Sequence, residues 1–242
     1  MKTLIVTLAI TAAIATCLSV KAQKGVTYMN DLNQRRQFES FKSISIYGNF
    51  NLFLNQLYSE KGISEMVIEA REELLKRIIT KVKDDVLYIY ADDPENKRLI
   101  ADIFLSFRDL EHIEAFGNVS IETVDVIDLK EMEVSMNDRS KCFLFVDTDK
   151  FSFTAKGHGT TDISARCDDM KLIVCGNSNV TLELEANTFT GNLFDFGTIS
   201  IVGTTLIEEA EMFDKRIIGS QEEALKQSLE KKSNICRYEK SE

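Results

Sequence analysis

The sequence predicts a mainly β protein, a β-helix-like solenoid with coils of about 20 residues and a C-terminal helical segment. The first observation is a recurring turn residue, because only glycine and asparagine readily accept positive φ. Such residues stand twenty positions apart at Gly117, Asn137, Gly157, Asn177 and Gly197. The second is that the position four residues before each turn residue is apolar in four coils of five. Coils stacked about 4.8 Å apart would align these apolar columns into a narrow core.

Short alternating segments predict the strands. In the repeats they follow each turn residue, at 119–121, 142–146, 161–165, 180–184 and 199–202. Before the repeats, strands are expected at 41–46, 50–54, 66–69, 86–90 and 100–107. Tyr47-Gly48-Asn49 predicts a hairpin or a sharp strand corner. Residues 71–80 are rich in helix formers and predict one or two helical turns.

The chain divides into four expected parts. Residues 1–22 have the charged start, apolar run and small-x-small-like end of a secretory signal. A lipoprotein site at Cys17 is the weaker alternative, and Lys21 with the short apolar run disfavours a membrane-spanning helix. Residues 23–39 form a polar leader, and 40–206 form the β-helix-like domain, with repeats from about 110 to 202. Residues 207–242 predict a helical cap and a charged tail, a helical arm for a partner being the alternative.

Charge and cysteine content exclude several functions. The chain carries 29 basic and 39 acidic residues, and loss of Lys2 and Lys21 with the signal would leave a net charge of −12. An acidic chain without a basic run is not a nucleic-acid binder. The four remaining cysteines, at 142, 167, 175 and 236, match no zinc pattern. A Cys167–Cys175 disulfide stays open, but buried free thiols are favoured.

The strand and turn segments together resemble a known family. Phe41-Lys-Ser-Ile-Ser-Ile-Tyr-Gly-Asn-Phe-Asn-Leu, Val67-Ile-Glu-Ala, Val86-Leu-Tyr-Ile-Tyr and His112-Ile-Glu-Ala-Phe-Gly, with the repeats after them, resemble the head GIN domain family of auto-transporter adhesins. The resemblance covers residues 41–202 and departs from the family's Gly-Ser-Gly pattern at the turns. It implies a right-handed parallel β-helix-like fold and export to a bacterial envelope or beyond. It implies no particular enzymatic activity.

Aspartates offer the one speculative site. In the twenty-residue register Asp109, Asp149 and Asp169 share a column, and Asp128 and Asp168 share the next. Stacked coils would gather these carboxylates at one corner, where a hard cation such as calcium takes oxygen ligands. Lys150 or Arg166 would be the nearby base of a lyase-like site. The alternative, which we favour, is a solvated corner whose charges discourage aggregation.

The sequence contains no other recognisable catalytic or cofactor-binding motif. His112 and His158 lie in no catalytic pattern, and nucleophile, phosphate-binding and dinucleotide motifs are absent from the sequence. The sequence therefore predicts no catalytic residue and no cofactor-binding residue. Calcium is the one candidate cofactor. Phenylalanines at 143, 145, 151, 153, 189, 194 and 196 fill the core or form an outward ladder, the core being favoured.

These observations predict a non-enzymatic exported binding protein, adhesin-like, in the periplasm, on the outer surface or secreted by a bacterium. Its partner would be a glycan or an envelope protein. The alternatives are a carbohydrate-active enzyme of the polysaccharide-lyase kind, by fold analogy, and a structural spacer of the envelope.

Overall fold

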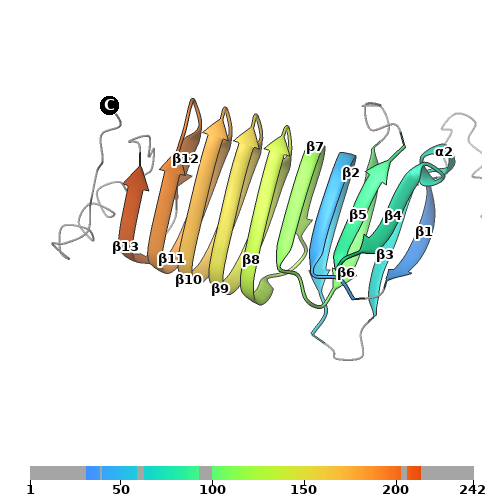
Figure 1. Cartoon of the computed structure of the whole chain (residues 1–242), viewed down its shortest axis with the longest axis horizontal. Helices are drawn as coiled ribbons and strands as arrows, with labels where there is room; N and C mark the ends of the chain where they lie inside the picture. The colour runs from blue at the N-terminus through green and yellow to red at the C-terminus, as the bar shows by residue number, and fades with distance from the viewer. Residues whose placement is uncertain (1–30, 39, 59–62, 93–99, 203–205, 214–242) are drawn as a thin grey trace, which may run out of the picture. The chain divides into compact units, whose positions relative to one another are not determined.

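The computed structural model describes residues 31–38, 40–58, 63–92, 100–202 and 206–213. The described residues are mainly β, as predicted, and their strands form one sheet of thirteen (Figure 1). The strands are β1 (Asp31–Phe38), β2 (Ser43–Gln56), β3 (Ser64–Arg71), β4 (Ile78–Lys83), β5 (Val86–Ala91), β6 (Ala101–Phe107), β7 (His112–Thr123), β8 (Ile127–Asp138), β9 (Lys141–Gly157), β10 (Thr160–Gly176), β11 (Asn179–Leu193), β12 (Thr198–Ile201) and β13 (Leu206–Phe213). One short helix, α2 (Glu72–Leu75), occurs among the described residues. The predicted signal at 1–22 and the tail beyond 213 lie outside them.

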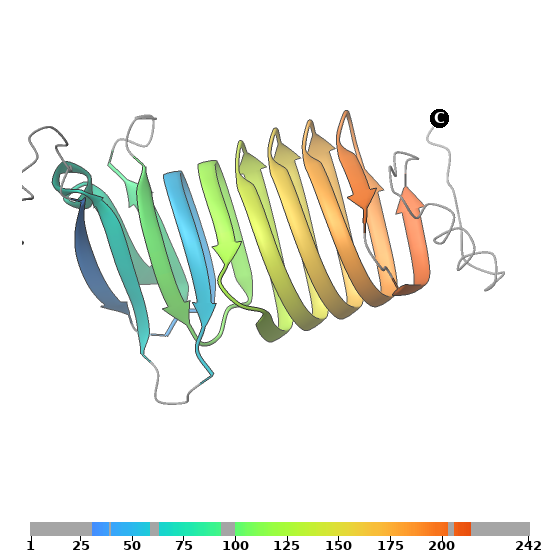
Figure 2. The ribbon, with the colours of Figure 1, turned by 180° about the vertical axis from the view of Figure 1, so that it is seen from behind.

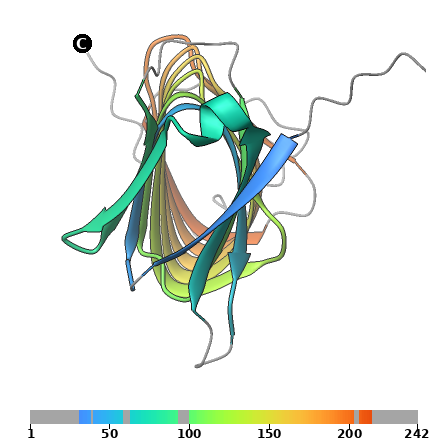
Figure 3. The same cartoon turned by 90° about the vertical axis from the view of Figure 1, so that its right-hand side faces the viewer.

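The sheet folds into two layers because its long strands bend midway. The first half of β2 pairs with β5, and its second half pairs with β6. We call the two layers the β5 layer and the β6 layer. β7 bends in register with β2, from the β5 layer to the β6 layer. β9, β10 and β11 also contribute to both layers, but their first halves lie in the β6 layer and their second halves in the β5 layer. Figure 3 looks along the direction in which the strands stack and shows the two layers facing each other, and Figure 2 shows the stacked strands from behind.

Parallel pairing repeats every nineteen residues in the second half of the chain. Thr161 of β10 pairs with Cys142 of β9 and with Val180 of β11. The step is longer at the two ends, since His112 pairs with Glu133, 21 residues later, and Glu185 pairs with Leu206, also 21 residues later. The predicted period of twenty is therefore wrong by one residue per step, although the order of strands and turns is right.

The true turn column has positive φ throughout and differs from the predicted one. It contains two residues of the expected set, Gly117 and Gly157. Asp138 and Gly176 take the places predicted for their neighbours Asn137 and Asn177. The whole column comprises Gly48, Gly117, Asp138, Gly157, Gly176 and Asp195, at steps of 21, 19, 19 and 19 residues from Gly117 onward. Gly48 shows that the predicted bend at 47–49 is a corner within β2 rather than a hairpin.

Close stacking explains which residues this column accepts. A Cβ atom on Gly157 would lie 2.2 Å from the backbone oxygen of Asp138. Asp138 has a φ of 58°, in the left-handed region that aspartate tolerates. Its carboxylate accepts a 2.9 Å hydrogen bond from the Gly117 backbone N–H, and Asp195 accepts a 3.1 Å bond from Gly176 in the same way. Where the column lacks glycine, a side chain thus caps the preceding turn.

The hydrophobic core lies between the two layers. Alternate residues of each strand point inward, as the burial pattern of β9 shows. Phe151, Phe153 and Phe189 are each only 1% exposed, so the prediction that the repeat-zone phenylalanines fill the core holds for these three. Phe143, Phe145, Phe194 and Phe196 are half-buried or exposed instead.

Both ends of the sheet differ from prediction. Asp31–Phe38, within the predicted leader, forms β1 and pairs antiparallel with β3. Leu206–Phe213, predicted to begin a helical cap, forms β13 and pairs parallel with β11. Unpaired backbone groups at a sheet edge recruit a further strand even where the residues lack clear alternation. The helical turns expected at 71–80 are confirmed only for Glu72–Leu75, which form α2 and bury Leu74 and Leu75 against the core, whereas residues 78–80 belong to β4.

Candidate functional site

Four phenylalanines lie in two pairs on the outward face of the β6 layer. Phe104 of β6 pairs with Phe53 of β2, and their rings stack with centroids 4.9 Å apart. Phe143 and Phe145 of β9 meet edge to face at 4.8 Å. The side chains of Phe104 and Phe143 are 40% and 44% exposed. We call these four residues the phenylalanine stripe; exposed apolar side chains gathered on one face of a sheet mark interaction surfaces.

One exposed carboxylate divides the stripe into its two phenylalanine pairs. Glu122 of β7 lies in register between Phe53 and Phe143. Val67 of β3 extends the row beyond Phe104. The row of register partners therefore crosses five strands, three of which carry the phenylalanines of the stripe, and the phenyl rings offer no hydrogen-bonding group.

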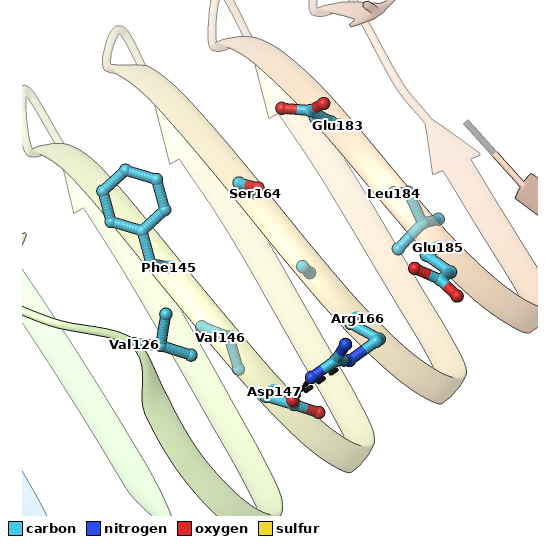
Figure 4. A pocket seen from close by; sticks show the side chains of 10 residues that line it. Val126, Phe145, Val146, Asp147, Ser164, Arg166, Glu183, Leu184 and Glu185 are labelled. Atoms are coloured by element: carbon cyan, nitrogen blue, oxygen red, sulfur yellow. Dashed lines mark hydrogen bonds and ion pairs between the residues drawn. The ribbon is translucent and has the colours of Figure 1, made fainter. Parts of the chain in front are cut away.

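A hollow adjoins the Phe145 end of the stripe. It encloses about 300 Å³ and is lined by Val126, Phe145, Val146, Asp147, Ser164, Ala165, Arg166, Glu183, Leu184 and Glu185 (Figure 4). Three of these, Val146, Ala165 and Leu184, are buried and form its floor. Phe145 and Val126 form an apolar end, and charged side chains form the other end.

The loop before β8 is held in place by the end of β2. The Gln56 side-chain amide donates to the Asp128 carbonyl at 2.6 Å and accepts from the Asp128 N–H at 2.7 Å. The Tyr58 hydroxyl donates to the Val126 carbonyl at 3.0 Å. These bonds position Val126 as one wall of the hollow. The wall is thus built by side chains about seventy residues earlier in the chain.

Most of the charged residues at the hollow belong to a row of paired residues that crosses neighbouring strands. The register places Asp128, Asp147, Arg166 and Glu185 side by side on four strands. Arg166 donates from Nε to Asp147 at 3.0 Å and from a second nitrogen to the same carboxylate oxygen (Figure 4). This hydrogen bonding, then the charge of Asp147, raises the pKa of Arg166 above its ordinary value. The ion pair with Asp147 therefore favours the protonated form of Arg166, which disfavours it as the general base of the lyase hypothesis.

The predicted aspartate columns are wrong because they assumed a period of twenty. Asp128 pairs with Asp147, and Asp169 pairs with Lys150. Asp149 and Asp168 occupy equivalent positions at the bends of β9 and β10, where the pairing skips one residue on each strand, and Asp109 lies before β7. The described part of the chain contains no cluster of three or more histidine, cysteine or acidic side chains placed to hold a metal. Calcium stays a prediction without such a cluster to support it.

Neither of the other predicted candidates joins a catalytic arrangement. Lys150 lies in register between Glu131 and Asp169, which makes it part of a charge ladder. His112 Nδ1 lies 3.7 Å from a Glu133 carboxylate oxygen on the surface, and His158 is exposed at a turn.

The cysteines among the described residues are free. Cys142 and Cys167 are buried, as favoured from the sequence, and Cys175 is partly exposed. Cys167 lies in the first half of β10 and Cys175 in the second half, so the bend separates them into different layers. Cys236 lies outside the described residues.

The Cys142 thiol should make the stability depend on alkaline pH. Burial raises its pKa to about 12, whereas an unfolded cysteine titrates near pH ~8.5. Above the unfolded value, the unfolded chain releases a proton that the folded chain keeps. The free energy of unfolding should then fall by about 1.4 kcal/mol per pH unit until the folded pKa is reached. Urea unfolding across this range should show a shallower decline for Cys142→Ala, and parallel declines would contradict the assignment.

Comparison with known proteins now places the chain. Residues 40–205 match the family described as "Putative auto-transporter adhesin, head GIN domain". The chain belongs to the head GIN domain family. No curated protein matches it. Among the described residues of this head GIN domain protein, no helix is long and apolar enough to cross a membrane.

Solved structures share the fold at low sequence identity. A "putative adhesin" from Bacteroides fragilis aligns with a TM-score of 0.61 and 13% identity, covering 81% of this chain and 98% of that one. A "putative adhesin" from Parabacteroides merdae gives 0.60 and 14%, covering 78% and 85%. A "Putative lipid binding protein" from Parabacteroides distasonis gives 0.56 and 14%, covering 79% and 95%. At these identities the likeness concerns the fold alone.

Sequence reasoning found only part of the site. It considered Phe143 and Phe145 for an outward ladder but missed Phe53 and Phe104, which precede the repeats. Phe53 carries a usable signal, because it falls between Leu52 and Leu54, two inward positions of an alternating strand. The pairing with Phe104 depends on strand order, which the sequence pattern does not specify.

Proposed function

We propose that this head GIN domain protein is an exported, non-enzymatic binding protein of the bacterial envelope or cell surface, with an adhesin-like role. The phenylalanine stripe, with its adjoining hollow, is the binding surface. One observation carries the proposal: Phe104, Phe53 and Phe143 expose aromatic area along one face of a rigid sheet. The expected signal at 1–22 and the family membership support export.

The scaffold we infer is a right-handed β-helix-like solenoid. Its support is the nineteen-residue parallel register that links β8 to β12 in sequence order. Parallel crossover connections are right-handed in nearly all proteins, which fixes the expected hand. Each turn of such a scaffold adds one strand to this face; the stripe ends at β9, because Phe143 and Phe145 pair with Asp162 and Ser164 of β10.

The partner best suited to this surface is a polypeptide segment of the envelope. Phenyl rings without hydroxyl groups favour apolar side chains over sugars. The hollow's charged end carries Asp147, Glu183 and Glu185 against the single cation Arg166, so its net charge is negative. A segment with an apolar side chain and a basic one matches both ends. The same negative charge would repel anionic lipid headgroups, which disfavours the lipid binding suggested by one neighbour's name.

Direct binding to bacterial envelope fractions tests the proposal. The purified protein and a Phe53→Ser/Phe104→Ser/Phe143→Ser variant would be compared by sedimentation with intact, protease-treated, deglycosylated and delipidated envelopes. We expect the variant to bind about tenfold more weakly or worse, since it loses three aromatic contacts. Protease treatment should abolish the part of wild-type binding that the triple variant lacks, whereas the other treatments should leave that part.

A matched control separates binding from folding. Ser152→Ala and Thr154→Ala change outward residues of β9 on the opposite layer and should leave binding unchanged. Thermal melting should give similar midpoints for all variants. Unchanged binding by the triple variant would overturn the proposal. So would release of unsaturated sugars from an acidic polysaccharide that is lost on Lys150→Ala, which would establish the lyase alternative.

A further inference from the structure

The opposite outward face carries a second aromatic surface of different chemistry. Tyr90 of β5 pairs with Tyr47 of β2, and Tyr47 pairs with Phe116 of β7. Tyr88 lies two residues before Tyr90 and points to the same side. We call these four residues the tyrosine platform. It lies on the β5 layer, whereas the phenylalanine stripe lies on the β6 layer.

Hydroxyl groups distinguish the tyrosine platform from the stripe. Tyr47 is 41% exposed, and Tyr88 and Tyr90 are partly exposed. The Tyr58 hydroxyl has a backbone acceptor within the described residues, but the hydroxyls of Tyr47, Tyr88 and Tyr90 have no such partner there. A tyrosine row therefore offers ring faces together with free hydrogen-bonding groups.

Lys81 of β4 adds a positive charge at the side of the platform. Its Nζ lies 5.5 Å from the Tyr88 ring centroid and 5.9 Å from the Tyr90 centroid. No described carboxylate pairs with it. By contrast, the nearby Lys83 contacts Asp84 at 3.7 Å, and the nearby Arg77 pairs with Asp92 at 2.6 Å. Lys81 thus keeps its charge available in a chain whose net charge is −10.

We propose that the tyrosine platform and Lys81 bind an acidic glycan. Adjacent strands are about 4.8 Å apart, so the register sets Tyr90, Tyr47 and Phe116 in one row across three neighbouring strands, along which a linear sugar chain can lie. The negative faces of aromatic rings attract the polarised C–H groups of a sugar. The tyrosine hydroxyls reach the sugar hydroxyls, and Lys81 pairs with a sugar carboxylate.

Charge and polarity favour this ligand over the other candidates. An apolar polypeptide would bury the free tyrosine hydroxyls without partners, at a cost that a sugar avoids. A polyanion of high charge density would be repelled by the acidic chain, including Glu114, which lies on β7 in register with Ser45. A glycan with isolated carboxylates needs only the single cation present, Lys81.

The test uses the purified protein with oligosaccharides of uronic and sialic acids and with their carboxyl-reduced counterparts. Calorimetry should show that Lys81→Gln weakens binding of the acidic sugars about tenfold, the scale of one charge-assisted hydrogen bond. The same change should leave the weaker binding of the reduced sugars unaffected. Tyr47→Ser/Tyr90→Ser should weaken both classes, because it removes the stacking surface.

Control variants separate this site from the rest of the surface. Lys171→Gln removes an exposed lysine of the same layer whose register partners are Ser152 and Thr190, and it should bind as wild type. The Phe53→Ser/Phe104→Ser/Phe143→Ser variant should also bind acidic sugars normally, so failure of one surface does not imply failure of the other. No wild-type binding to any acidic sugar would overturn the inference. Equal affinity for the reduced sugars, or Lys81-dependent binding to anionic vesicles instead, would overturn it as well.

Discussion

Replacing Gly157 by alanine is expected to lower the free energy of unfolding by about 3 kcal/mol or more. Its φ of +123° lies in a region that only glycine occupies at low cost. In addition, the new Cβ would lie 2.2 Å from the backbone oxygen of Asp138, which a sheet cannot move cheaply. Urea unfolding followed by circular dichroism measures the change.

A second variant in the same column supplies the control. Asp138→Gly removes the carboxylate that accepts the Gly117 N–H bond but accepts the φ of 58° without strain. It should cost about 1 kcal/mol, the value of one hydrogen bond. If Gly157→Ala costs no more than Asp138→Gly, close stacking at this column does not limit stability.

The turn column also shows how far the sequence could predict the fold. The predicted repeat of twenty residues located each turn to within two residues, and this was enough to predict the order of the strands. It failed on the exact residue because aspartate was not counted among the turn residues, although Asp138 and Asp195 both adopt left-handed backbone. Aspartate reaches that region because its short side chain bonds locally, here to the preceding turn.

The error of one residue per step mattered more for the site than for the fold. A shift of one position in a strand moves every side chain to the other face. It therefore joined Asp149 with Asp169, whereas the true register sets Asp169 beside Lys150. It also hid the pair of Arg166 with Asp147. Side-chain chemistry on a stacked sheet is predictable only when the period is correct to the residue.

The sheet edges escaped prediction for a different reason. The burial pattern of β9 alternates because one face meets the core. β1 pairs only with β3 and lies at the end of the sheet, where much of each side chain is exposed. With little core to face, its sequence carries weak alternation. The backbone pairing that forms it is a tertiary effect that local pattern does not encode.

Strand β9 carries both buried and outward-facing phenylalanines, and the buried ones predict the second large effect on stability. Phe153→Ala should lower the free energy of unfolding by about 3–5 kcal/mol, because it removes a buried ring and leaves a cavity. Phe153 is 1% exposed, and its ring meets that of Phe151 edge to face with centroids 6.2 Å apart. Urea unfolding measures the free energy of unfolding of each variant. The slopes of the transitions should be equal, so that the free energies can be compared.

Phe143→Ala in the same strand is the matched control. Its ring faces outward and meets Phe145, so its removal should cost about 1 kcal/mol and leave no cavity. The two variants should therefore separate stability from binding: Phe153→Ala weakens the fold, and Phe143→Ala weakens attachment to the envelope. Similar losses of stability would contradict the placement of the core between the layers. A stable Phe143→Ala protein that binds normally would instead show that this end of the stripe is not the binding surface.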